Sequence, residues 1–217
     1  ENIGDILAPL LTIQAAIDRA EPGNMIVVHP GTYEHIAVDQ DISIVSLAYI
    51  EENENIIRLT TIDGGDTTNA VSFTNVSSSA SLRGFTITGG YAVYGPGIYL
   101  ENAYPILNRL VIVGNHTPTV GGQGGGIYCI ESSPSISSVT IADNSATEGG
   151  AIYIYENSAP DIINAIIWNN APVDGQQIVF SNQGTATSLN LSYSDVQNSS
   201  AGWSLGNTNS PIIDGSV

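Results

Sequence analysis

The chain has 217 residues, of which 42% are hydrophobic, so it can bury one continuous core without disulfide bonds or a structural metal. It has 21 acidic residues and only four basic ones, all of them arginine, and the formal net charge is -17. Such a charge repels phosphate backbones, anionic bilayers and polyuronates, so we expect no nucleic-acid partner. Because no apolar run reaches the roughly 18 residues of a membrane span, we expect no membrane insertion.

The first element expected along the chain is a short helix. Thr12 is a candidate N-cap, apolar residues follow it at helical spacing, and Glu21-Pro-Gly23 would end the helix after Ala20. We therefore predict that residues 1–24 form a cap over one end of the fold. Strands are expected next at Met25–Val28, a turn at His29–Tyr33, and less regular strands at 42–45, 56–62 and 70–73.

Two sequence motifs then recur with a common period. The first is an apolar strand followed by Gly, Asp or Asn, and it begins at positions offset by 25, 29 and 26 residues: Phe85, Leu110, Val139 and Ala165. The second follows each copy of the first, with offsets of 29, 25 and 26 residues: Gly97, Gly126, Ala151 and Gln177. Two independent motifs thus agree on one structural unit per 25 to 29 residues, the signature of a solenoid.

Each unit is expected to be a coil of short strands, because its apolar residues alternate and glycine pairs fall where a helix would have to continue. Stacked coils would bury two rows of side chains: Ile98, Ile127, Ile152 and Ile178, and Leu100, Cys129, Ile154 and Phe180. Equivalent asparagines at a strand end would form a hydrogen-bonded ladder at a turn: Asn115, Asn144 and Asn170. The pattern predicts a single all-β domain over residues 1–217, with coils over 25–197 and a closing segment over 198–217.

Several segments resemble a known group of proteins. Thr12–Tyr33 resembles the start of right-handed parallel β-helix proteins of the pectin-lyase-like superfamily, and Ile62–Gly65, Gly84–Gly90 and Gly124–Tyr128 resemble the bacterial surface-protein branch of that group. The resemblance covers roughly Thr12 to Asp214. It implies a single-stranded right-handed parallel β-helix with a short N-terminal capping helix, a fold whose members include lyases, hydrolases, adhesins and structural surface proteins.

Catalytic residues are sparse in this sequence. A polysaccharide lyase needs a base and cationic groups near a uronate, and this chain offers only scattered arginines, of which Arg83 and Arg109 are expected one above the other. A hydrolase needs clustered carboxylates. The best catalytic or metal-binding cluster is His116, Asp143 and Glu148, beside a glycine-rich loop, although residues of this kind are more often solvated turn residues.

Two further candidate sites follow from the pattern. Asp63 and Asp66 flank a glycine pair in a segment that resembles a calcium loop, although such a pair more often marks a turn, so calcium is an open alternative to no cofactor at all. An exposed tyrosine stripe is expected on the face opposite the core, where it would either stack on sugar rings and partners or stabilise neighbouring strands: Tyr99, Tyr128, Tyr153 and Tyr155.

These features predict a non-catalytic extracellular β-helix module, secreted or at the cell surface, with a structural, adhesive or filament-forming role. Its expected partners are glycans, other surface proteins or further copies of itself. The alternative is an extracellular carbohydrate-active enzyme, either a polysaccharide lyase or a glycosidase, for which the acidic candidates would have to meet in a cleft.

Overall fold

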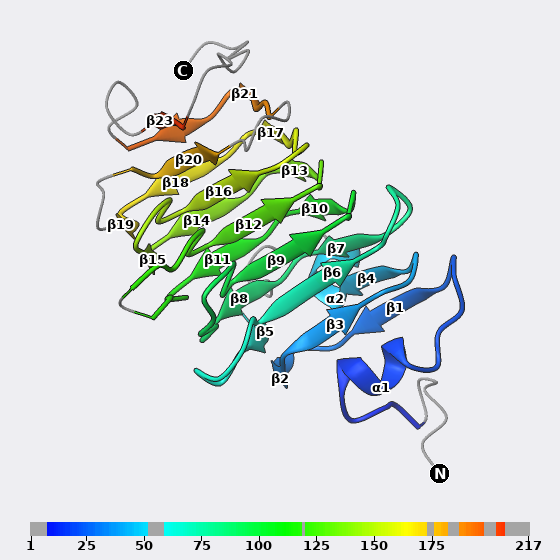
Figure 1. Cartoon of the computed structure of the whole chain (residues 1–217). Coiled ribbons are helices and arrows are strands. Elements are labelled where there is room, and N and C mark those ends of the chain that lie inside the picture. The colour runs from blue at the N-terminus through cyan, green and yellow to red at the C-terminus, as the bar shows by residue number, and fades with distance from the viewer. Residues whose placement is uncertain are drawn as a thin grey trace.

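The computed structural model describes residues 8–51, 59–118, 120–172, 176–181, 187–197 and 203–206, the last for the backbone alone. Over this part the chain winds as a β-solenoid, whose coils stack from the N-terminal helix at one end to the last strands at the other (Figure 1). Successive strands enter three parallel sheets in turn, and each sheet has seven strands. The predicted all-β parallel β-helix is confirmed.

The strands have the following bounds. In spatial order, the first sheet contains β1 (Met25–Val28), β4 (Ser43–Ser46), β7 (Ser81–Arg83), β10 (Ile106–Asn108), β13 (Ser135–Ser137), β17 (Asp161–Ile163) and β21 (Asn190–Ser192). The second contains β2 (Gly31–Glu34), β5 (Thr60–Asp63), β8 (Thr86–Thr88), β11 (Val111–Val113), β14 (Thr140–Ala142), β18 (Ile166–Trp168) and β22 (Asp195–Val196). The third contains β3 (Ile36–Val38), β6 (Val71–Thr74), β9 (Ile98–Glu101), β12 (Ile127–Ile130), β16 (Ile152–Tyr155), β20 (Ile178–Ser181) and β23 (Trp203–Gly206), while β15 (Ser145–Ala146) pairs with β19 (Ala171–Pro172).

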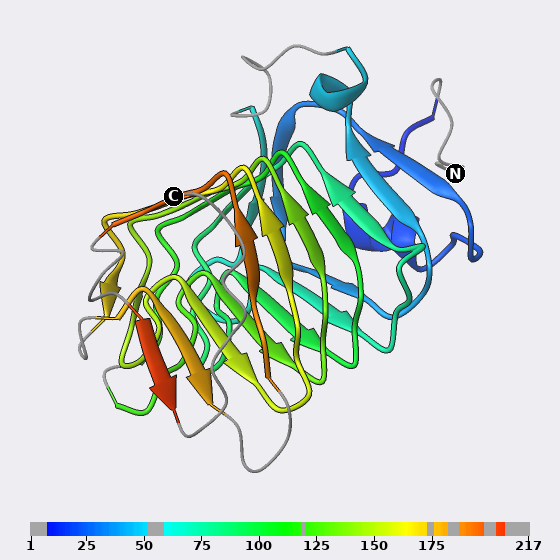
Figure 2. The same ribbon diagram turned by 90° about the horizontal axis from the view of Figure 1, so that it is seen from above.

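Sharp corners separate the sheets within each coil, as the view in Figure 2 shows. Between the first and second sheets, one residue has a positive φ in each of five coils: Gly84, Arg109, Ser138, Asn164 and Tyr193. After the second sheet the same conformation recurs at Gly89, Gly114, Asp143 and Asn169. Glycine, asparagine and aspartate tolerate this left-handed region best, and they fill all four of the positions after the second sheet. At the first corner Arg109, Ser138 and Tyr193 adopt it as well.

The core is a set of side-chain rows that run through the stacked coils. In the third sheet, both predicted rows are in register from β9 through β12 and β16 to β20. Their members are all buried, and Cys129 fills one position of a row as a small apolar side chain. Burial raises the pKa of the Cys129 thiol, so the residue is an inert part of the core.

The predicted asparagine ladder is confirmed at the corner after the second sheet. Asn144 Oδ1 accepts hydrogen bonds from the backbone N–H and the Nδ2 of Asn115, at 3.0 and 2.9 Å. Asn170 Oδ1 accepts the same pair from Asn144, at 3.1 and 3.0 Å. The ladder starts at the N–H of Gly90, which donates to Asn115 Oδ1, and it ends on Gln177, whose Oε1 accepts from Asn170. The amides thus satisfy backbone and side-chain groups of consecutive coils in a buried environment.

Helix α1 (Ile13–Ile17) closes the N-terminal end of the core, as predicted. Thr12 is its N-cap and accepts a hydrogen bond from the N–H of Ala15 at 3.1 Å. Ile13 and Ile17 are buried in the same core cluster as the strand residues. The helix is shorter than expected. The predicted turn at His29–Tyr33 is also partly wrong, because strand β2 already begins at Gly31 and pairs with β5.

The second helix, α2 (Leu47–Ile50), is absent from the prediction and lies outside the three sheets (Figure 2). Tyr49 covers Gly84, where any Cβ would lie 2.8 Å from the tyrosine Cβ. The guanidinium groups of Arg83 and Arg109 lie 5.8 and 5.3 Å from the centre of the Tyr49 ring. The two arginines are not in one row, since Arg83 pairs with Asn108, but both pack against this one ring and help to hold α2 on the sheet.

The remaining predictions fall near the ends of the described ranges. The expected strand at 56–62 begins only at Thr60, and residues 52–58 lie outside the described part. Within the predicted closing segment, β23 pairs with β20 and extends the third sheet, while the rest of that segment lies outside the described residues. In the part of the chain that the structure covers, no helix has the length and apolar character needed to cross a membrane.

The asparagine ladder gives a stability prediction. Replacing Asn144 by Ala removes the Oδ1 that accepts from the backbone N–H and the Nδ2 of Asn115, and the Nδ2 that donates to Asn170 Oδ1 and to the Ile112 carbonyl. We expect a loss of about 3 kcal/mol in the free energy of unfolding, measured by urea denaturation followed by circular dichroism. Asn190→Ala is the control: it removes one exposed bond to Asp161 and should cost less than about 1 kcal/mol. Equal costs for the two variants would contradict a structural role for the ladder.

Candidate functional site: a tyrosine cluster on the third sheet

Three tyrosines stand in one row on the outer side of the third sheet. Strands β9, β12 and β16 place Tyr99, Tyr128 and Tyr153 in register, each one residue after a buried isoleucine. Because side chains alternate along a strand, all three point away from the core. Their rings stack, with centroids 5.8 Å apart between the first two and 5.5 Å between the second two, and with interplanar angles of 4° and 11°.

The expectation that this stripe is exposed is wrong for its central members. Tyr128 and Tyr153 are only 5% and 4% exposed. They form a second apolar cluster outside the solenoid, together with Val179 and the partly buried Tyr99, Ile130 and Tyr155. We call this set, with Tyr94, the tyrosine cluster. The rings bury one another and are covered further by the loop between β8 and β9, from which Tyr94 packs on Tyr128 with ring centroids 5.2 Å apart.

The loop that carries Tyr94 is held by side-chain and backbone contacts. Asn69, just before β6, donates from Nδ2 to the carbonyl oxygens of Tyr94 and Gly95, at 2.6 and 2.8 Å. Gly95 has a φ of +53°, and a Cβ there would lie 2.5 Å from the Ile98 carbonyl oxygen and 2.8 Å from Tyr128 Cβ. Only glycine allows this close approach, so the loop is fixed over the stacked rings.

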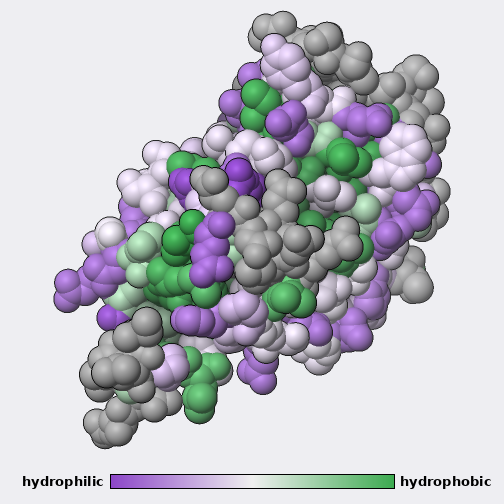
Figure 3. All heavy atoms as spheres, turned by 180° about the vertical axis from the view of Figure 1, so that it is seen from behind, coloured by the Kyte–Doolittle hydropathy of each residue, from purple (hydrophilic) through white to green (hydrophobic). Residues whose placement is uncertain are grey.

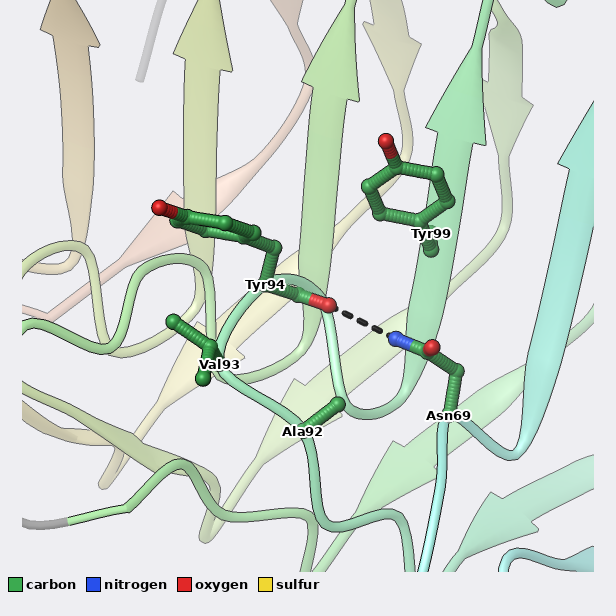
Figure 4. Close-up of a pocket in the computed structure, with 5 residues that line it drawn as sticks. All are labelled: Asn69, Ala92, Val93, Tyr94 and Tyr99. Atoms are coloured by element: carbon green, nitrogen blue, oxygen red, sulfur yellow. Dashed lines mark hydrogen bonds between the residues drawn. The ribbon is translucent and has the colours of Figure 1, made fainter.

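Beside the buried rings lies a shallow hollow of about 280 Å³. It is lined by Asn69, Ala92, Val93, Tyr94 and Tyr99, and Figure 4 shows these side chains around it with the bond from Asn69 to the Tyr94 carbonyl. Tyr94 and Val93 are 46% and 42% exposed. None of the four tyrosines of the predicted stripe is exposed, since Tyr99 and Tyr155 are partly buried. The exposed aromatic ring at this place belongs to Tyr94, which the prediction did not include.

The cluster also has a distinct electrostatic character. The pKa of Tyr99 is raised to about 12, first by burial and then by the charge of Glu101, whose Oε2 accepts a hydrogen bond from the phenol at 3.2 Å. Burial is also the main cause that raises the pKa of Tyr128 and of Tyr153. The neighbouring phenols add to it at Tyr128, and Glu148 and then Tyr155 add to it at Tyr153. For Tyr155 the main cause is a hydrogen bond to Glu156, which raises its pKa. These phenols remain neutral donors across the physiological pH range.

The three candidate catalytic residues have different partners. His116 packs against Tyr91, and its Nε2 lies 4.0 Å from Asp66 Oδ1. Glu148 Oε2 accepts a hydrogen bond from Gln123 Nε2 at 2.8 Å, and the Asp143 carboxylate accepts one from Asn169. The backbone of His116 pairs with that of Ser145 in the next coil. Among the described residues, no hydrogen bond or ion pair joins any two of His116, Asp143 and Glu148.

Asp143 is accounted for by the local backbone. It occupies the corner position that Gly89, Gly114 and Asn169 fill in other coils, with a φ of +54°. Aspartate tolerates this conformation, so the turn alone is sufficient reason for the residue type.

The candidate calcium ligands are likewise part of a turn. Asp63 Oδ1 accepts a hydrogen bond from the N–H of Gly65 at 2.9 Å, and Asp66 has a φ of +54°. Within the described ranges, no three His, Cys, Asp or Glu side chains are grouped closely enough to hold a metal ion. Calcium binding by this pair stays a prediction from the sequence.

Comparison with known proteins gives one local match. Residues 138–155 are similar to the Chlamydia polymorphic membrane protein repeat. The match begins at the corner residue Ser138, passes through β14, the ladder residue Asn144 and a glycine pair, and ends in β16 with Tyr155. It therefore covers less than one coil, and supports a β-helix repeat protein. No curated protein and no solved structure shows significant similarity to the chain, and the pectin-lyase-like part of the resemblance stays a prediction.

Sequence reasoning missed Asn69, Val93 and Tyr94, which shape the hollow. They lie in loops, outside the repeated strand motifs from which the tyrosine stripe was predicted. A signal was nevertheless present: Tyr94 is followed by Gly95-Pro-Gly97, a combination that indicates a tight turn returning to the next strand.

The raised pKa values predict a loss of stability at alkaline pH. A phenol whose pKa is higher in the folded state than in the unfolded chain contributes its full stabilisation below pH 10 and loses it as the pH rises through the folded value. Tyr128→Phe keeps the ring but removes the buried ionisable group. We expect it to shift the midpoint of alkaline unfolding, followed by circular dichroism, to higher pH. Tyr104→Phe, outside the cluster, is the control, and an identical shift in both variants would show that ionisation of Tyr128 is not the cause.

Proposed function

We propose that the chain is a non-catalytic surface module that binds glycans at the hollow beside the tyrosine cluster. The observation that carries this proposal is the exposed ring of Tyr94, which packs on Tyr128 and lines the same hollow as Tyr99. Tyrosine presents a broad apolar face and a hydroxyl group, a combination suited to stacking on a sugar ring while bonding its hydroxyls. Asn69 and Tyr99, which line the hollow, supply further polar atoms, and the Tyr99 phenol donates to the Glu101 carboxylate.

The size and charge of the site restrict the ligand. Small-molecule pockets usually exceed about 300 Å³, so a hollow of about 280 Å³ suits one or two sugar units at most. The chain carries a net charge of -17, and Glu101 lies beside Tyr99. Uronates and sulfated sugars would be repelled by this field, so we propose neutral sugars as the ligand class.

The proposed location is the cell surface or the extracellular space. The similarity of residues 138–155 to a repeat of polymorphic membrane proteins supports a surface location. The long, regular outer faces of a solenoid suit adhesion, since they present many copies of a short structural unit to one side.

The test is a glycan array probed with the purified chain, with and without calcium, with each hit then measured by isothermal titration calorimetry. We expect a neutral glycan to bind, and Tyr94→Ala and Tyr99→Ala to raise its Kd at least about tenfold, because each removes an aromatic contact worth about 1.4 kcal/mol or more. Tyr104→Ala is a matched control, since Tyr104 is a similarly exposed tyrosine outside the hollow.

The same array separates the proposal from its alternatives. Cleavage products that disappear in Asp143→Asn or Glu148→Gln would replace the proposal with a carbohydrate-active enzyme. A calcium-dependent signal that is lost in Asp63→Asn would assign a site to the calcium candidates. Silence across the array would favour a structural or filament-forming role.

A further inference from the structure

A second exposed surface, near the C-terminal end of the solenoid, contains four large apolar side chains. Ile163 on β17, Ile166 and Trp168 on β18, and the corner residue Tyr193 are 40%, 51%, 47% and 71% exposed. We call these four residues the apolar patch. Figure 3 views the molecule from behind, and toward the end where the last coils lie it shows apolar spheres among polar ones.

The repeat itself shows that the fold does not require these residues. The backbone register pairs Ile163 with Ser137, Ile166 with Thr140, and Trp168 with Ala142 in the preceding coil. Small or polar side chains therefore occupy the equivalent outward positions one coil earlier. On the next coil, Ser192 and Asp195 pair with Ile163 and Ile166.

A group of this kind at the surface of a soluble protein usually marks an interaction site, because exposed apolar area has no stabilising role in the isolated chain. Tryptophan and tyrosine are also the residues that most often dominate the binding energy of protein interfaces. The apolar patch lies on the first two sheets, whereas the tyrosine cluster lies on the third, so the two surfaces are separate.

Acidic side chains surround the apolar patch. Asp161 lies two residues before Ile163 on the same face of β17, and Asp195 is the register partner of Ile166. The exposed Asp143 accepts a hydrogen bond from Asn169, which directly follows Trp168. An apolar centre with an acidic rim is complementary to a partner with an apolar centre and a basic rim.

We propose that the apolar patch docks a protein partner that presents aliphatic or aromatic side chains flanked by Lys or Arg. The net charge of -17 argues against a second copy of this chain, since two such surfaces would repel each other at close range. This surface does not depend on the glycan-binding proposal, because it uses other strands and other residues.

The proposal is tested with a fluorescently labelled amphipathic peptide of lysine and leucine, and with a peptide in which glutamate replaces lysine. Fluorescence anisotropy should show saturable binding of the lysine peptide to the intact chain and none of the glutamate peptide. The double variant Ile166→Thr and Trp168→Ala gives these two positions the residue types of the preceding coil, where Thr140 and Ala142 occupy them. We expect it to weaken binding at least tenfold.

Control variants distinguish docking at the apolar patch from binding elsewhere and from loss of the fold. Val93→Thr removes an exposed apolar side chain on the third-sheet side and should leave the peptide Kd unchanged. Circular dichroism must show that the double variant keeps its fold; if it does not, Trp168→Thr alone is used. Equal affinity of the intact chain and the variant would show that charge alone attracts the peptide and would overturn the proposal. Sedimentation that reveals a dimer abolished by the double variant would overturn it too, by making a second copy the occupant.

Discussion

The buried asparagine ladder is the interaction on which the rest of the solenoid depends. A chain that turns sharply out of a strand leaves backbone N–H and C=O groups without partners, and at this corner they lie inside the protein, where water cannot satisfy them. The amides of Asn115, Asn144 and Asn170 supply both donors and acceptors, and each bonds to the coil above or below. The same bonds therefore complete one corner and fix its distance to the next. Apolar stacking supplies most of the stabilisation, but the amides set the register in which the apolar rows meet.

Because the buried ladder fixes the register, the residues on the outer faces can differ from one coil to the next. Outward residues on the three sheets are serine and asparagine in some coils, threonine and valine in others, and aromatic only in particular places. The stacked tyrosines occupy one such place and the apolar patch another. Because the strands beneath them are equivalent in backbone geometry, strand conformation alone does not account for the difference in residue type. Equivalent outward positions in successive coils can therefore be compared with one another, and the comparison shows which side chains the backbone geometry does not require.

Much of the fold could be predicted because it repeats. The apolar rows, the ladder and the capping helix each left a signal of fixed spacing, and their positions were confirmed, including the pairing of Ile98, Ile127, Ile152 and Ile178. Helix α2 was missed because it has only four residues and its packing on Gly84 is a long-range contact without a local pattern. For the site, the row of tyrosines was predicted correctly but its exposure was not. Alternation tells which side of a strand a residue faces, whereas the loop that then covers Tyr128 comes from another part of the sequence.

The spacing around the ladder has an evolutionary consequence. Gly97 follows Gly90 by seven residues, whereas Gly126 follows Asn115 by eleven, and yet the strands on both sides keep the same register. A coil can therefore gain residues between its ladder position and its next strand without disturbing its neighbours. The loop with Val93 and Tyr94 occupies this tolerant interval in its own coil. Insertions and substitutions in this interval, away from the close approach at Gly95, would reshape the rim of the hollow while the scaffold stays intact, so descendants of such a gene could change this surface without changing the fold.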